Sequence, residues 1–184
     1  HAAFSHAQQP FGLDTTFHTS ITLDGSDGPT RVSSIYVMEN GDVLLSGKMK
    51  FPGDEFVRVL AKIHPDGSRD ESFPYAYGGG AIVPWNDRIY VANGQAVRRL
   101  WTDGVEDDAF NMLASWDEFI PAQLGNYHIY PDGKVLICGS HLLSDTVHGF
   151  DGYYNLIWFT NTGRLDTTRT HRACDGFIYR IFPL

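Results

Sequence analysis

The sequence has little cysteine, no cluster of basic residues and no long apolar stretch. Its two cysteines, Cys138 and Cys174, allow at most one disulfide and no structural zinc site. We expect two buried thiols, with a disulfide as the alternative for an exported chain. The net charge of −8, with no run of Lys and Arg, argues against nucleic-acid binding. No apolar segment approaches the roughly 18 residues needed to cross a bilayer.

Several catalytic motifs are also missing. The sequence contains no G-x-S-x-G nucleophile motif, no glycine-rich phosphate loop and no H-E-x-x-H metal motif. The eight histidines are interpreted as scattered surface or loop residues, because none has the spacing of a metal-ligand pair. The sequence therefore assigns no catalytic residue and requires no cofactor.

Glycine, proline and aromatic residues are abundant by contrast. There are 19 Gly and 9 Pro in 184 residues, and aromatic residues make up 14% of the chain. This composition is typical of many short strands joined by tight turns. The length suits one domain with a substantial core.

An acidic turn recurs four times along the chain. Each copy is an apolar strand, a turn with small or polar residues, an acidic residue and, in the first three copies, an aromatic residue. The repeated positions are Asp14, Asp70, Asp107 and Asp166, followed by Phe17, Phe73 and Phe110. The acidic residues are 56, 37 and 59 residues apart (14 to 70 to 107 to 166), which brackets the 40–50 residues typical of a propeller blade. We expect each carboxylate to accept backbone N–H bonds in its own hairpin and the phenylalanines to pack between blades.

Predicted hairpins fill the space between these turns, at residues 32–47, 81–94 and 127–139. Asn40-Gly41 and Asp132-Gly133 supply residues that tolerate positive φ, as two-residue hairpin turns require. Two hairpins per repeat would make a four-stranded antiparallel blade. We therefore predict an all-β fold with about three blades and a partial blade at each end, the last beginning at 177–182.

Two segments carry a family resemblance. The stretch from Tyr130 to Gly139 reads strand–PDG–K-V-L-I-C-G, and the stretch from Leu60 to Phe73 reads L-A-K-I–HPDG-S-R-D-E-S-F. Together they resemble the delta-60 repeat family of exported bacterial proteins, over residues 12–184. The resemblance implies β-propeller blades and a secreted or cell-surface setting, and it brings no catalytic residues.

The ends of the chain bear on this expectation. Residues 1–11 form an N-terminal extension in which Ser5-x-Ala7 resembles the end of a secretory signal. A closed propeller needs at least four blades. We therefore expect either a segment of a longer protein or separate copies that complete one ring, so that further blades come from the same protein or from another chain.

Candidate binding residues lie in the predicted turns and loops. Trp85, Trp116, Tyr153 and Tyr154 are predicted to bind a protein or glycan, with inter-blade packing as the alternative. The insert 140–154 is predicted to be a functional loop. Asp24 and Asp27 are the candidates for a calcium site, with turn capping as the alternative.

Three functions remain open from the sequence. The first is a non-catalytic secreted or cell-surface binding or scaffold module that acts through loops on one propeller face. The second is a propeller hydrolase or lyase whose axial site is completed by further blades. The third is a component or cargo of an outer-membrane protein assembly.

Overall fold

The computed structural model describes residues 15–22, 30–92, 96–112, 127–145, 147, 149–176 and 178–182. Regular structure in this part of the chain consists of β-strands, so the prediction of an all-β fold is confirmed. Within these residues there is no helix of the length and apolar character needed to span a membrane.

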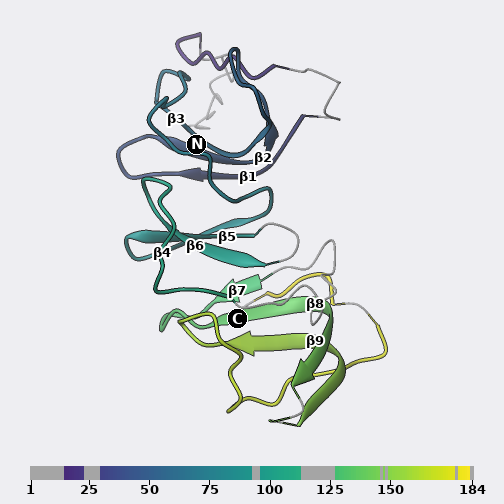
Figure 1. Ribbon diagram of the computed structural model, residues 1–184. Helices are drawn as coiled ribbons and strands as arrows, with labels where there is room; N and C mark the ends of the chain where they lie inside the picture. The colour runs from purple at the N-terminus through teal and green to yellow at the C-terminus, as the bar shows by residue number, and fades with distance from the viewer. Residues whose placement is uncertain are drawn as a thin grey trace, which may run out of the picture.

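The strands form three antiparallel sheets in chain order. The first sheet contains β1 (Arg31–Val37), β2 (Val43–Met49) and β3 (Arg58–Ile63). The second contains β4 (Ile82–Trp85), β5 (Arg88–Ala92) and β6 (Val97–Trp101), and the third contains β7 (Tyr127–Ile129), β8 (Val135–Asp145) and β9 (Phe150–Phe159). The sheets follow one another as a stack (Figure 1), with β1 in contact with β4 and β4 in contact with β7.

The strand pairs repeat at a regular spacing along the chain, although the acidic turns are unevenly spaced. Val43, Ile89 and Val135 pair with Ile63, Leu100 and Phe159, the residues that bridge to the acidic turns, and they follow at steps of 46 residues (43 to 89 to 135). The connection between the second and third strands differs in length, from 50–57 in the first sheet to 93–96 in the second. The unequal spacing of the acidic turns therefore arises between the second and third strands, from the longer connection in the first sheet and from the longer strands β8 and β9 in the third.

In the described residues each sheet has three strands, and the predicted fourth strand is not observed. Each third strand instead makes an antiparallel bridge to the acidic turn, between Leu100 and Glu106 in the second sheet and at the equivalent places in the other two. The acidic turn explains this, because Asp107 N–H donates to Arg99 O and Phe110 N–H then donates back to Asp107 O. The chain reverses at this turn, and among the described residues it pairs with the third strand again in the third sheet, where Arg172 bridges to Leu156.

Two other predicted segments have a different structure. The insert 140–154 is largely a long hairpin, in which β8 continues to Asp145 and β9 begins at Phe150. A register shift at Gly139, whose φ is +148°, realigns the strands and lets the ladder continue. Residues 178–182 are not in a strand, so the prediction of a new inner strand there is wrong.

Much of the core lies between the sheets, and one further cluster, which includes Leu45, Met49 and Ile63, belongs to the first sheet. Leu44 and Leu60 of the first sheet meet Ile89, Val91 and Leu100 of the second in one buried cluster. A larger cluster joins the second and third sheets and includes Tyr90, Val97, Phe110, Tyr127, Val135 and Phe159. Since each fully buried aliphatic or aromatic side chain contributes about 1.5–3 kcal/mol, these junctions hold the stack together.

Glycines in the acidic turns fix the spacing between successive units. Gly104 has a φ of +90°, and a Cβ there would lie 2.7 Å from the Phe73 ring. A Cβ at Gly163 would lie 2.5 Å from the backbone carbon of Asn111. Only glycine fits such close approaches at positive φ, so each turn lies directly against the end of the preceding unit.

Candidate functional site

The repeated aspartates hold equivalent places in the three units. Oδ1 accepts the backbone N–H two residues later, from Ser72 at 2.9 Å in the first unit and from Ala109 at 3.0 Å in the second. In the third unit Asp166 Oδ1 accepts from Thr168 N–H at 3.1 Å. Asp14 lies outside the described residues. These bonds replace lost backbone partners at the chain reversal, which is a structural role.

Charge partners of the aspartates differ between units. Asp70 Oδ2 lies 2.8 Å from Lys62 Nζ. Asp107 Oδ2 accepts from Arg99 Nε at 2.7 Å and Arg88 Nε at 2.6 Å. Burial alone would raise the pKa of Asp107, but the Ala109 N–H and the two guanidiniums outweigh it and hold the pKa below its usual value.

The three repeated phenylalanines do not share one environment. Phe73 and Phe110 are buried in the two sheet junctions. Phe17 is exposed, so the prediction that it packs between blades is wrong. Its neighbour His18 lies against the turn at Gly67, with His18 N–H donating to Asp66 O.

The aromatic residues predicted to bind a ligand also differ in how far they are exposed. Trp85 lies in the junction of the second and third sheets, where its Nε1–H donates to Pro131 O at 3.1 Å. Tyr154 is half-buried near Phe150 and His171. Tyr153 is 60% exposed. Trp116 lies outside the described residues, as do the calcium candidates Asp24 and Asp27.

Cys138 and Cys174 do not form a disulfide. Cys138 is buried, as expected, but Cys174 is exposed and its thiol donates to Gly176 O. The prediction of two buried thiols is therefore wrong for Cys174.

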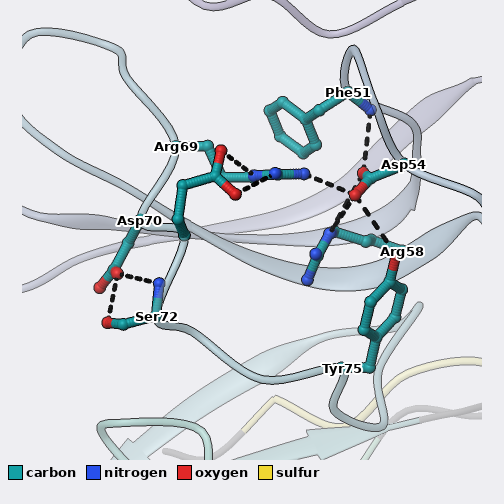
Figure 2. Close-up of polar contacts among 8 residues, drawn as sticks. Phe51, Asp54, Arg58, Arg69, Asp70, Ser72 and Tyr75 are labelled. Atoms are coloured by element: carbon teal, nitrogen blue, oxygen red, sulfur yellow. Dashed lines mark hydrogen bonds and ion pairs between the residues drawn. The ribbon is translucent and has the colours of Figure 1, made fainter.

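A buried carboxylate network lies at the outer edge of the first sheet, in the connection between β2 and β3 (Figure 2). Asp54 accepts from Phe51 N–H at 3.1 Å and from Arg58 Nε, which lies 3.1 Å from both carboxylate oxygens. Arg69 Nη1, from the acidic turn after β3, donates to Asp54 Oδ1 at 2.6 Å. One carboxylate therefore ties the inserted loop to both β3 and the following turn.

Charges in this network are balanced. Arg69 also pairs with Glu71, so two guanidiniums face two carboxylates. Burial would raise the pKa of Asp54, but the Phe51 N–H and the two guanidiniums more than offset it, so the pKa lies below its usual range. Asp54 is thus ionised and occupied by bonds at neutral pH, which suits a structural anchor.

Two exposed tyrosines lie on the arginines of this region. The Tyr75 ring is 3.9 Å from Arg58 Cζ, and its hydroxyl lies 3.3 Å from Asp54 Oδ1. The Tyr77 ring is 4.8 Å from Arg98 Cζ on β6. The two tyrosines are 56% and 50% exposed. We name Tyr75 and Tyr77, with Arg58 and Arg98 against them, the tyrosine rim.

The geometry of the rim determines what it can do. Each guanidinium is held by a carboxylate, Arg58 by Asp54 and Arg98 by Glu106 at 2.8 Å. A held guanidinium on one ring face fixes the ring, while the ring's exposed area remains open to a ligand. Rings fixed in advance bind at a lower entropy cost. The rim can therefore stack against a flat apolar surface and offer its hydroxyls as hydrogen-bond partners.

Sequence reasoning missed the rim because its tyrosines and arginines come from separated parts of the chain. Tyr75 and Tyr77 immediately follow the Phe73-Pro74 end of an acidic turn, and their arginines are 17 and 21 residues away (58 to 75, 77 to 98). One sequence signal could have indicated the rim. Two aromatic residues lie at alternate positions just before Gly78-Gly79-Gly80, outside any predicted strand, where exposed aromatics are unusual.

Comparisons with known proteins add little. No family model matches the chain, and no curated protein matches it. One solved structure, titled "Crystal structure of polysaccharide lyase Uly1", is similar with a TM-score of 0.40 and 18% identity over 77% of this chain. The matched part spans 29% of that lyase chain. A similarity this weak assigns no activity here, and the delta-60 resemblance stays a prediction.

Proposed function

We propose that this chain is a non-catalytic binding module that holds a neutral glycan on the tyrosine rim. The observation that carries the proposal is the exposure of Tyr75 and Tyr77 on guanidiniums that are already held by carboxylates. An aromatic ring fixed in this way presents an apolar surface bordered by a hydroxyl. The apolar face of a sugar ring matches such a surface.

The size and charge of the rim favour a glycan over a protein. A stable protein interface buries roughly 1,000 Å² or more, which is more than two tyrosine rings and their arginines supply. The two tyrosines are two residues apart in one segment of the chain, so their rings can contact successive parts of one sugar chain. Since the arginine charges are balanced locally, an anionic ligand gains no advantage over a neutral one.

The proposed setting follows from the resemblance described above. We take the three sheets as blades of a propeller-like protein of the delta-60 kind, secreted or displayed at a cell surface. The rim lies at the edges of the first and second sheets. Its arginines are on β3 and β6, and its tyrosines are in the segment that joins β3 to β4. A ligand there would run across the junction of two blades.

Binding of defined glycans tests the proposal. Cellulose, xylan, mannan and laminarin oligosaccharides would be screened on an array, and affinities for positive ligands measured by calorimetry. Tyr75→Ala and Tyr77→Ala should each weaken binding about tenfold, which corresponds to about 1.4 kcal/mol. Tyr153→Ala is the matched control, because Tyr153 is equally exposed on the third sheet.

Three outcomes would overturn the proposal. Glycan binding that depends on Tyr153 but not on Tyr75 or Tyr77 would move the site to the β8–β9 hairpin. Binding to none of the neutral glycans, with capture of a protein partner that both rim substitutions abolish, would make the rim a protein interface. Cleavage of a bound polysaccharide would show that the module is an enzyme.

A further inference from the structure

One residue at the end of each third strand differs in kind between the three sheets. It follows the residue that bridges to the acidic turn, and its N–H donates to the carbonyl four residues later. The distance is 2.8 Å for His64 and Trp101 and 2.7 Å for Thr160. The same backbone bond places these three residues at equivalent positions, so their side chains can be compared directly.

Polar bonds account for two of these side chains. Nδ1 of His64 lies 3.1 Å from Oδ1 of the buried Asp42, and Thr160 Oγ1 accepts the N–H of Arg164 at 3.2 Å. Each side chain therefore helps to hold the turns at its end of the sheet. An indole has no acceptor for a backbone N–H, and two of the three units do without an aromatic ring here. The repeat itself therefore does not require Trp101.

Trp101 lies on an arginine that two carboxylates hold. The centroid of its ring is 3.8 Å from Arg88 Cζ. Arg88 Nε donates to Asp107 Oδ2 at 2.6 Å, and Arg88 Nη1 pairs with Asp87. Trp101 is still 37% exposed, and Val105, whose carbonyl accepts its N–H, is 54% exposed. This arrangement repeats that of the tyrosine rim, in which an open ring is fixed on a held guanidinium.

The Trp101 ring and the tyrosine rim lie on opposite faces of the second sheet. Successive side chains of a strand point to opposite faces, and Arg98 is three positions before Trp101 on β6. Arg98 shares the face of Leu100, which packs toward the first sheet. Trp101 shares the face of Val97, which packs toward the third sheet. The two aromatic surfaces are therefore separate.

We propose that Trp101, fixed on Arg88, is a second glycan-binding site of this chain. The class of ligand rests on the function proposed for the rim, since both sites present a fixed ring, and an indole offers the larger apolar face. Arg88 and Arg99 face Asp87 and Asp107, so the charges balance and a neutral sugar is preferred. With two sites, the chain binds a polysaccharide more tightly than a short oligosaccharide, because the second contact is intramolecular.

Binding stoichiometry tests the second site. Cellotetraose, xylotetraose, mannotetraose and laminaritetraose would each be titrated by calorimetry, and a tetrasaccharide that binds should occupy two sites per chain. Trp101→Thr and Tyr75→Ala should each weaken one site about tenfold and leave the other unchanged. Threonine is the residue of the third sheet at this position, so Trp101→Thr should not disturb the fold. Trp101→Phe keeps a ring and should retain both sites, as should the control Tyr153→Ala.

Tryptophan fluorescence gives a second readout, because a sugar on the indole should change its emission. Trp101→Thr should remove that change, and Tyr75→Ala should leave it. Binding that Tyr75→Ala weakens and Trp101→Thr leaves unchanged would overturn the second site and leave the function proposed for the rim. Binding that only Trp101→Thr weakens would support the second site and overturn the rim. Binding of none of the four tetrasaccharides would overturn both.

Discussion

Asp107 and Asp166 occupy the same place in successive units and are held in different ways. Both are buried, and both accept the N–H two residues later through Oδ1. Asp107 Oδ2 receives two arginine bonds, whereas Asp166 Oδ2 is buried with no hydrogen-bond partner among the described residues and lies 3.6 Å from Lys134 Nζ. The place of Arg99 is taken by Trp158.

This difference separates two roles of one repeated residue. The hydrogen bonds that Oδ1 accepts stabilise the turn and recur in every described unit. The hydrogen bonds that Oδ2 accepts neutralise a cation, and they are needed where a guanidinium is buried between two sheets. Arg99 is 5% exposed and also bonds Tyr90 Oη and Asn161 O, so it connects the second and third sheets. The turn is the constant part of the repeat, and the ion pair is an addition.

The largest expected effect is the loss of the Asp107 charge. Asp107→Asn keeps an oxygen for the Ala109 N–H but leaves Arg99 buried without its counter-charge. Removing one partner of a buried pair costs about 3–5 kcal/mol, which urea denaturation would measure. Adding Arg99→Met to Asp107→Asn should recover part of the loss. A single-substitution loss below about 1 kcal/mol would contradict this account.

The two turn glycines should respond in the opposite order to the aspartates. A Cβ at Gly163 meets backbone atoms of Asn111, which cannot move alone, whereas a Cβ at Gly104 meets the Phe73 ring, which can shift. We expect Gly163→Ala to cost about 2–3 kcal/mol and Gly104→Ala about 1–2 kcal/mol by thermal or urea denaturation. Gly53→Ala is the control, because Gly53 has a φ of +86° and no atom within 4 Å of its Cβ position.

Acid pH should distinguish the two aspartates in the intact chain. Hydrogen bonds and cations hold the pKa of Asp107 and of Asp166 below the usual value despite burial. A lowered pKa in the folded state stabilises the fold above about pH 4, and this stabilisation is lost as the pH falls through the folded value. Denaturation midpoints between pH 7 and pH 2 should therefore fall on the acid side. Asp107→Asn should flatten that fall more than Asp166→Asn, and equal slopes would contradict the comparison.

The tight turns are the part of the fold that can be predicted best from the sequence. Asn40-Gly41 and Asp132-Gly133 lie in tight hairpin turns, with Gly41 at a φ of +87° and Gly133 at +80°. The number of strands in each sheet was harder to predict. The residues that follow the third strand have the same pattern whether they form a single bridge or a full fourth strand. The length of the β8–β9 hairpin depended on a bulge at Gly139 that restores the pairing.

Binding surfaces were harder still to predict, because they depend on contacts between units. Trp85 is a turn aromatic by sequence, yet Tyr90 and the Gly133 turn of the next sheet surround it. Tyr75 gains its significance from Arg58, which is brought beside it by an inserted loop and a buried carboxylate. Exposure and burial of single aromatics are decided by neighbouring sheets, which a local pattern does not specify.

The smallest expected effect belongs to Asp166→Asn. The amide keeps an acceptor for the N–H of Thr168, and the oxygen it replaces has no hydrogen bond to lose. Lys134 is one-third exposed, so water can solvate its charge once the carboxylate is gone. We expect a loss of about 0.5–1 kcal/mol in urea denaturation, several-fold below that of Asp107→Asn. Asp166→Ala, which also removes the turn bonds, should cost more than Asp166→Asn, and an equal cost would show that the constant part of the repeat is not the turn.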